Sequence, residues 1–113
     1  MTPLDESKIV ATRTLDGVTP SGERTRVVIT IGTPYAQGNG FRCPVRIEGL
    51  DYDYTPPDMA GWDAVHALVA AITIAASLTD DFVVRGGRVF WPGTETPYDF
   101  ADFTIDFRAP KQT

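Results

Sequence analysis

The most regular pattern of hydrophobic positions in the chain spans residues 61–79 and has the period of an α-helix. This stretch, GWDAVHALVAAITIAASLT, contains no proline and no internal glycine. Apolar side chains recur every three or four residues along one face, which predicts that the helix packs on a core through them. The positions on that face are Val65, Leu68, Val69, Ile72, Ala75 and Ala76.

Acidic residues predict where this helix begins and ends. A carboxylate from Asp58 or Asp63 would accept hydrogen bonds from the amide groups of the first turn. Asp80 and Asp81 follow Thr79, where the helix dipole disfavours negative charge. We therefore expect the helix to end by Thr79.

The other face of the helix is only weakly polar, because alanine and isoleucine occupy most of it: Ala64, Ala67, Ala70, Ala71 and Ile74. A helix that is apolar nearly all round needs cover on more than one side. We expect a sheet on one side and the C-terminal segment or a second subunit on another. The run is shorter than the roughly 20 apolar residues that cross a membrane and it contains His66, so no membrane span is expected.

Alternating apolar and polar residues predict three strands before the helix, at residues 8–15, 24–31 and 41–47. The third strand alternates most clearly. One of its faces should meet the helix and carries Phe41, Cys43, Val45 and Ile47. Pro44 removes a backbone donor, which indicates an edge strand or a bulge.

Two extended segments follow the helix. Residues 81–91, interrupted by the glycine pair at 86–87, form either a hairpin or a loop followed by one short strand, and we favour the second. Residues 103–107 alternate again and predict a last strand or an extended segment over the helix. The sequence thus predicts one α+β domain over residues 1–113: an antiparallel sheet of four or five strands with one long helix packed on one face. Its ends, residues 1–7 and 109–113, should be loose.

Length and composition agree with a single globular domain. The chain has 113 residues, of which 42% are hydrophobic and 22% charged. Its single cysteine cannot form an internal disulfide. The first residues, MTPLDESKIV, lack the apolar core of a signal peptide, so we expect a cytoplasmic protein.

The net charge of −5 is unevenly distributed. Residues 1–50 hold six basic and five acidic side chains, whereas residues 51–113 hold four basic and ten acidic ones. This excess of acid argues against nonspecific nucleic-acid binding and is compatible with a basic partner. It is equally compatible with a charge that only keeps a small domain soluble.

Short motifs of the chain resemble a family of short bacterial domains of unknown function. They are R-C-P and I-E-G-L at residues 42–44 and 47–50, G-x-D-A-x-x-A-L at 61–68 and a G-x-x-x-W-like strand at 87–91. The resemblance covers about residues 8–100 and implies a compact α+β fold and a bacterial or phage-like origin. The tail YDFADFTIDF departs from the Gly-Phe-Pro ending of that family. No activity, cofactor or catalytic residue comes with the resemblance.

Few residues of the chain suit catalysis or metal binding. Alternation places Cys43 in the core, where a thiol is unreactive, and His66 on the predicted helix is expected to be a boundary residue instead of a catalytic base. We therefore name no catalytic residue. One histidine and one cysteine do not make a tetrahedral metal site, and Asp51, Asp53 and Asp58 lack EF-hand spacing. Both glycine-rich loops lead into strands instead of helices, so no phosphate loop, cofactor or metal is expected.

An acidic aromatic set is the leading candidate for partner binding. Its members are Asp51, Tyr52, Asp53, Tyr54, Glu95, Tyr98, Asp99 and Asp102. Aromatic side chains are common anchors of interfaces, and acids around them attract basic partners. The alternative interpretation is that the aromatic rings pack on the helix while the acids face water.

An arginine set on the outer face of the sheet is the second candidate. Arg24, Arg26, Arg42 and Arg46 should share the face opposite the helix, where they would bind an anion or an acidic surface. The alternative is a solvated face on which Glu23 and Glu48 are counter-charges.

Three hypotheses of function follow from these patterns. The leading one is a non-enzymatic protein-binding module, in its specific form an immunity-like protein that occludes a basic partner. The second is a small-molecule or nucleotide-binding protein that uses the arginine set. The third is a structural homo-oligomer, such as a homodimer, that buries the second face of the helix.

Overall fold

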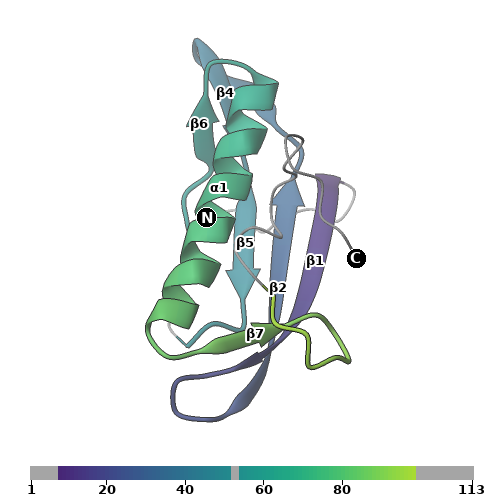
Figure 1. Ribbon diagram of the computed structural model, residues 1–113. Coiled ribbons are helices and arrows are strands. Elements are labelled where there is room, and N and C mark those ends of the chain that lie inside the picture. The colour runs from purple at the N-terminus through teal and green to yellow at the C-terminus, as the bar shows by residue number, and fades with distance from the viewer. Residues whose placement is uncertain (1–7, 52–53, 99–113) are drawn as a thin grey trace, which may run out of the picture.

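One long helix, α1 (Ala64–Val84), lies across two antiparallel sheets in the computed structural model, which describes residues 8–51 and 54–98 (Figure 1). The larger sheet has four strands in the order β5 (Val45–Glu48), β2 (Arg24–Gly32), β1 (Ile9–Val18) and β7 (Arg88–Phe90). The smaller sheet has three, β3 (Tyr35–Gln37), β4 (Gly40–Cys43) and β6 (Met59–Gly61). The α+β class, the four-stranded antiparallel sheet and the single long helix are therefore confirmed.

The second sheet was not predicted, because the strand expected at residues 41–47 divides at Pro44. Residues before Pro44 pair as β4 with β3 and β6, whereas residues after it pair as β5 with β2. Pro44 has no N–H to donate, and its carbonyl oxygen accepts a hydrogen bond from the amide of Gly32 at 2.9 Å. The alternation itself is confirmed, since Cys43, Val45 and Ile47 are all buried in the core.

The helix starts as predicted but ends later. Asp63 is its N-cap, and Asp63 Oδ1 accepts a hydrogen bond from the amide of His66 at 2.8 Å. The predicted end by Thr79 is wrong, because α1 continues to Val84. Two interactions outweigh the unfavourable effect of the helix dipole on Asp80 and Asp81. Phe82 is completely buried, and Asp81 Oδ2 accepts a hydrogen bond from Arg85 Nε at 2.9 Å.

Two glycines end the helix and connect it to β7, which is the single short strand favoured from the sequence. Gly86 has a φ of +108°, a conformation that other residues rarely adopt. Gly87 lies against the ring of Phe82, and a Cβ atom at this position would be 2.5 Å from Cε2 of that ring. A side chain at Gly87 would therefore push the buried aromatic ring out of place.

The buried face of α1 differs from the predicted one. Val65 and Val69 are 68% and 52% exposed, so these two positions of the expected core face are wrong. The predicted Ala75 and Ala76 are buried, and the helix packs through them together with Ala67, Ala71, Thr79 and Phe82. Large side chains of the sheets fill the space opposite the alanines, namely Leu15, Val27, Ile29, Ile31, Val45 and Ile47. Small residues on the helix let its backbone approach the sheets closely, which a face of valine and leucine would prevent.

By length and composition alone, α1 is apolar and long enough to cross a membrane, with 21 residues. The helix is thus longer than the apolar run expected from the sequence. The core helix of a soluble protein meets the same criterion, and the alanine face of α1 is buried against the sheets. Three segments with sequence-based predictions, residues 1–7, 103–107 and 109–113, lie outside the described residues.

Enlarging an alanine of the helix face tests this packing. We expect Ala71→Leu to lower the free energy of unfolding by about 1–3 kcal/mol, because Ala71 is completely buried against filled positions. Ser77→Leu on the exposed side of the same helix is the matched control and should have little effect. Urea unfolding of the two variants measures the difference, and equal losses of stability would contradict the alanine contact.

Candidate protein-binding surface

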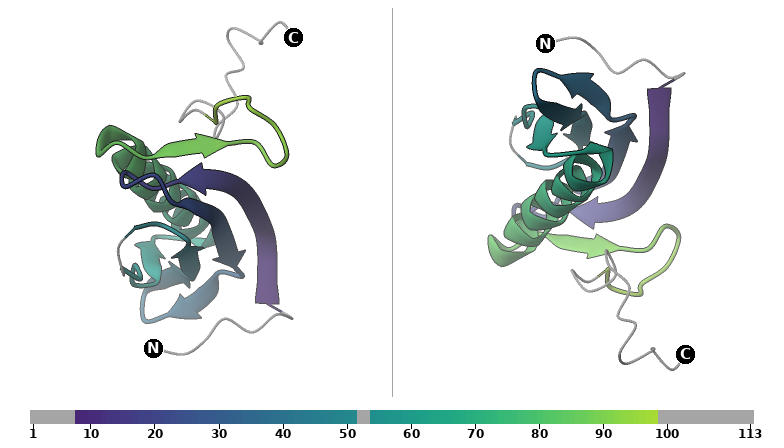
Figure 2. Two further views of the ribbon diagram at one scale, coloured as in Figure 1. Left: turned by 90° about the horizontal axis from the view of Figure 1, so that it is seen from below. Right: turned by 90° about the horizontal axis from the view of Figure 1, so that it is seen from above.

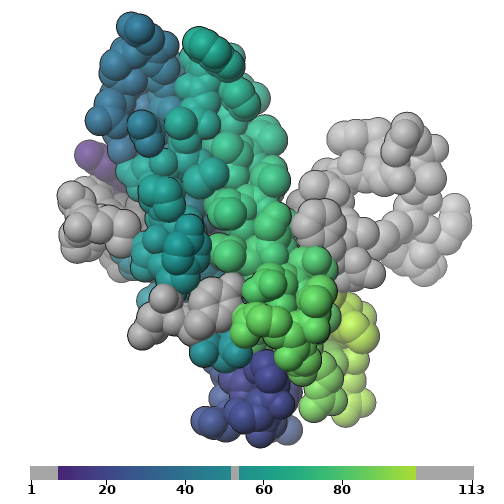
Figure 3. Space-filling view, turned by 90° about the vertical axis from the view of Figure 1, so that its left-hand side faces the viewer, coloured from purple at the N-terminus to yellow at the C-terminus, as the bar shows by residue number. Residues whose placement is uncertain are grey.

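Exposed apolar side chains gather at the start of α1 and along its outward side. Trp62 is 82% exposed and immediately precedes the N-cap of the helix. Val65 and Val69 follow at intervals of three and four residues, one helical turn apart. In Figure 3, α1 in green crosses the surface beside the blue β3–β4 hairpin. We call Trp62, Val65 and Val69 the helix patch.

The backbone beneath Trp62 is fixed by reciprocal hydrogen bonds. The amide of Trp62 donates to His66 Nδ1 at 3.0 Å, and the amide of His66 donates to Asp63 Oδ1 at 2.8 Å. These two side chains satisfy donors at the start of the helix, as a capping box does. The strand β6 ends at Gly61, directly before Trp62 and opposite Phe41 of β4. The indole is therefore exposed on an ordered segment that joins the small sheet to α1.

A shallow hollow of about 350 Å³ lies beside the helix patch. It is lined by Asn39 and Gly40 from the β3–β4 hairpin and by Ala60, Gly61, Trp62 and His66. Tryptophan buries a large apolar area when a partner covers it, so the exposed indole beside this hollow is a candidate contact site.

Asp58, which directly precedes β6, contacts the other two strands of the small sheet. The hydroxyl group of Tyr35 donates to Asp58 Oδ2 at 2.5 Å, and this hydrogen bond raises the pKa of Tyr35. Arg42 Nη1 lies 3.4 Å from the carbonyl oxygen of Asp58. Arg42 thus belongs to the small sheet and not to the face where the other arginines of its set lie.

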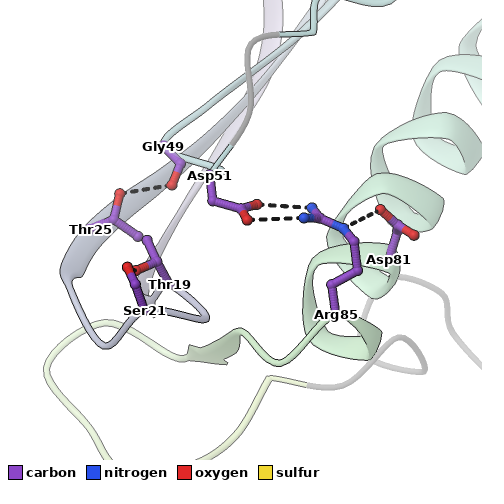
Figure 4. Close-up of polar contacts among 7 residues, drawn as sticks. All are labelled: Thr19, Ser21, Thr25, Gly49, Asp51, Asp81 and Arg85. Carbon is purple, nitrogen blue, oxygen red and sulfur yellow. Dashed lines mark hydrogen bonds and ion pairs between the residues drawn. The ribbon is translucent and has the colours of Figure 1, made fainter.

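The acidic aromatic set is divided between different environments. Asp51 forms a bidentate ion pair, with both oxygens 2.9 Å from guanidinium nitrogens of Arg85 (Figure 4). Tyr98 is 6% exposed, and its ring meets Trp91 edge-on with centroids 5.2 Å apart. Tyr54 and Glu95 are exposed. The other members, Tyr52, Asp53, Asp99 and Asp102, lie outside the described residues.

The Arg85 guanidinium connects the end of the β5 region to the helix. It contacts Asp51 through its terminal nitrogens and Asp81 through Nε (Figure 4). The hydrogen bonds from Arg85 lower the pKa of Asp51. Asp51 therefore has a structural contact within the chain that the sequence did not reveal, since 34 residues separate it from Arg85.

Three of the four predicted arginines lie on the sheet face opposite α1. Arg24 and Arg26 alternate with the buried Val27 along β2, and Arg46 of β5 is opposite Thr30. Arg88 of β7 joins them, because Arg24 and Arg88 flank Val18 of β1 in register. The sequence did not identify Arg88, since its place depends on how β7 pairs. Two acids lie on the same face, Asp16 opposite Arg26 and Glu48 opposite Val28.

The side chains of Cys43 and His66 both form hydrogen bonds with the backbone of the chain. Cys43 is completely buried, its thiol donates to the carbonyl oxygen of Gly32 at 3.3 Å, and burial raises its pKa to about 11. A thiol with such a pKa is almost entirely protonated at neutral pH and is a poor nucleophile. Over residues 8–51 and 54–98, no three His, Cys, Asp or Glu side chains come together in a way that could hold a metal ion.

The Asp51–Arg85 pair predicts a stability that depends on pH. The pKa of Asp51 is lower in the folded state than in the unfolded state. The contribution of this carboxylate to the free energy of unfolding is therefore fully present above the unfolded-state pKa, and it is lost as the pH falls through the folded-state pKa. We expect Asp51→Asn to lower the melting temperature at pH 7 and to have no effect in acid below that folded value. Asp80→Asn, an exposed helix acid, is the control. A melting temperature of Asp51→Asn that is lower than that of the wild type by the same amount at both pH values would contradict this role of the ion pair.

Comparison with known proteins identifies a family but no function. A family model described as a domain of unknown function, DUF6968, matches residues 11–102. No curated protein and no solved structure matches the chain. The resemblance to a family of uncharacterised domains is thereby confirmed, and the match extends over most of the 113 residues. The chain belongs to the DUF6968 family of domains of unknown function.

Proposed function

We propose that this protein is a non-enzymatic protein-binding module whose contact surface is the helix patch. The observation that carries the proposal is the 82% exposure of Trp62 on a backbone that two hydrogen bonds hold in place. Tryptophan is among the side chains that contribute most to protein interfaces. A fixed backbone also lowers the entropy lost when a partner covers the indole.

The helix patch suits a partner segment that lies along α1. Val65 and Val69 extend the apolar surface from Trp62 by two turns, and the hollow beside His66 accepts a protruding side chain. The exposed Asp63 directly follows Trp62 in the chain. An apolar centre with an acidic group at its rim favours a partner that has an apolar centre and a basic rim.

The acidic balance of the chain supports a basic partner. Residues 51–113, which include α1, carry ten acidic and four basic side chains. Long-range attraction by such a charge raises the rate of association with a basic protein and weakens as salt is added. Occlusion of a basic protein, as toxin-neutralising immunity proteins do, is the specific form of function that we favour.

Substitution within the helix patch tests the proposal. We expect a basic host protein to be retained by the immobilised wild-type chain at low salt, and its affinity to fall at least about tenfold with Trp62→Ala. Val84→Ser is the matched control, since Val84 is 76% exposed at the far end of the same helix. Both variants should keep the wild-type melting temperature. A partner that binds Trp62→Ala as tightly as the wild type contradicts the proposal.

The arginine face supports a second candidate, the binding of phosphate-bearing small molecules or nucleotides. Arg24 and Arg88 extend from strands on either side of β1, with Arg26 next to Arg24 on the same face. Neighbouring strands are about 4.8 Å apart, so Arg24 and Arg88 have backbones roughly 10 Å apart and can reach one anion.

A thermal-shift series with inorganic phosphate, pyrophosphate and nucleotides tests this candidate. A ligand that binds the folded state raises the melting temperature, and Arg24→Gln with Arg88→Gln should abolish that rise. Arg42→Gln in the small sheet is the control and should preserve it. A rise that survives in the double variant, or none with any ligand, excludes the arginine face.

A further inference from the structure

The side chain of His66 connects the exposed Trp62 to the first turn of α1. Its Nδ1 accepts a hydrogen bond from the amide of Trp62 at 3.0 Å, and its own amide donates to Asp63 Oδ1 at 2.8 Å. An imidazole accepts a hydrogen bond at Nδ1 only when that nitrogen carries no proton. The contact with Trp62 therefore requires the neutral side chain, with its one proton on Nε2.

The imidazole is open to water at this end of the molecule. The view from above in Figure 2 shows α1 beginning beside the small sheet, at the opposite end of the helix from β7. His66 is exposed and lines the hollow of about 350 Å³. Among the residues that line this hollow, His66 is the only one whose side chain titrates. Histidine side chains change their charge between about pH 5 and 8.

A proton on His66 would meet charges from two elements. On α1, His66 lies three residues after the N-cap, where the helix dipole disfavours a positive charge, whereas the carboxylate of Asp63 attracts one. On the small sheet, Arg42 shares a face with Ala60, its partner in the register, and lies beside Asp58. None of these charges replaces the lone pair that the added proton takes from Nδ1.

Protonation of His66 would remove the acceptor of the Trp62 amide. The amide and the ring would then present two donors to each other, and the hydrogen bond between them would be lost. Gly61, by contrast, is held by close packing, since a Cβ atom there would be 2.3 Å from the amide nitrogen of Ala67. The change is therefore expected at Trp62 and not in the strand that precedes it.

We infer that His66 makes the helix patch sensitive to pH: the neutral ring fixes the backbone of Trp62, and the protonated ring releases it. The effect on binding rests on the proposed function, because release raises the entropy that is lost when a partner covers the indole. A partner that prefers the fixed backbone favours the neutral ring. Its affinity is therefore highest above the pH at which His66 gains its proton, and it decreases as the pH falls through that value.

Nuclear magnetic resonance of the full-length protein between about pH 5.5 and 8 tests the inference without a partner. His66 is the only histidine of the chain, so its ring signals are unambiguous. We expect Nδ1 of His66 to carry no proton at the upper end of this range. The amide signal of Trp62 should shift along the same titration curve as the His66 ring.

Hydrogen exchange in the same samples measures the release of Trp62. Relative to the intrinsic exchange rate at each pH, the protection of the Trp62 amide should fall at least about threefold toward the acidic end, as expected for the loss of one hydrogen bond. Amides of residues 27–31 in the buried strand β2 report whether the domain stays folded. Carboxyl groups ordinarily titrate near about pH 4, below this range.

His66→Asn is the matched variant. Its side-chain oxygen can take the place of Nδ1 as the acceptor and does not titrate. We expect the protection of the Trp62 amide in His66→Asn to be equal at both ends of the range, and in His66→Ala, which has no acceptor, to be low throughout. The wild-type titration needs no variant, so it decides the inference even where a variant does not fold.

Three results would overturn the inference. The first is a proton on Nδ1 of His66 at the upper end of the pH range, and the second is a Trp62 amide signal that does not follow the titration of the ring. The third is a loss of protection toward acid that is equal in the wild type and in His66→Asn, or that occurs in parallel at residues 27–31.

Binding measurements separate this inference from the proposed function. For a basic protein that the wild type retains at the upper end of the range, acid should lower the affinity of the wild type by a larger factor than that of His66→Asn. Equal factors contradict the regulation, even when Trp62→Ala shows that the helix patch binds. A Trp62→Ala variant that binds as tightly as the wild type contradicts the proposed function, whereas the titration of the Trp62 amide decides the role of His66 independently.

Discussion

The close contact between the alanine face of α1 and the two sheets is the interaction on which the rest of the structure depends. Ala67, Ala71 and Ala75 have no exposed surface, and the sheets supply the bulk of the core opposite them. Burial of apolar area of this kind is the main favourable term in folding a chain of 113 residues. The helix also connects the sheets, because β4, β5 and β6 all pack against it.

The same contact determines which residues remain exposed. Because α1 turns its small side chains inward, its larger ones at Val65 and Val69 face outward and continue the apolar surface of Trp62. The opposite arrangement, with the valines in the core, would hide them and leave an alanine surface with little binding energy. Packing of the core and exposure of the helix patch are thus two results of one rotation of the helix.

The sequence predicted the parts of the fold that depend on local pattern. The helix, its Asp63 cap, the alternating strand around Cys43 and the short strand after the glycine pair all follow from spacing and from residue types with strong conformational preferences. The rotation of the helix could not be predicted, since both of its faces are apolar and the choice depends on the side chains of the sheets. The division at Pro44 and the pairing of β7 with β1 likewise depend on contacts distant in sequence.

The candidate site was harder to predict for the same reason. Asp51 and Tyr98 look like surface groups in the sequence, but distant residues engage them, Arg85 and the Trp91–Arg13 pair respectively. Trp62 looks like the first residue of a buried helix. Its position directly before the N-cap, followed by Val65 and Val69, is the pattern that could have indicated an outward patch.

Photocrosslinking in the native host tests the central claim most directly. A photoreactive phenylalanine analogue at Val65 would lie within the helix patch, and the same analogue at Val83, which is 42% exposed near the far end of α1, is the reference. The account predicts one discrete crosslinked product, containing a basic protein, from position 65 and none from position 83. The same product from both positions, or products only from the reference position, would contradict a binding surface centred on Trp62.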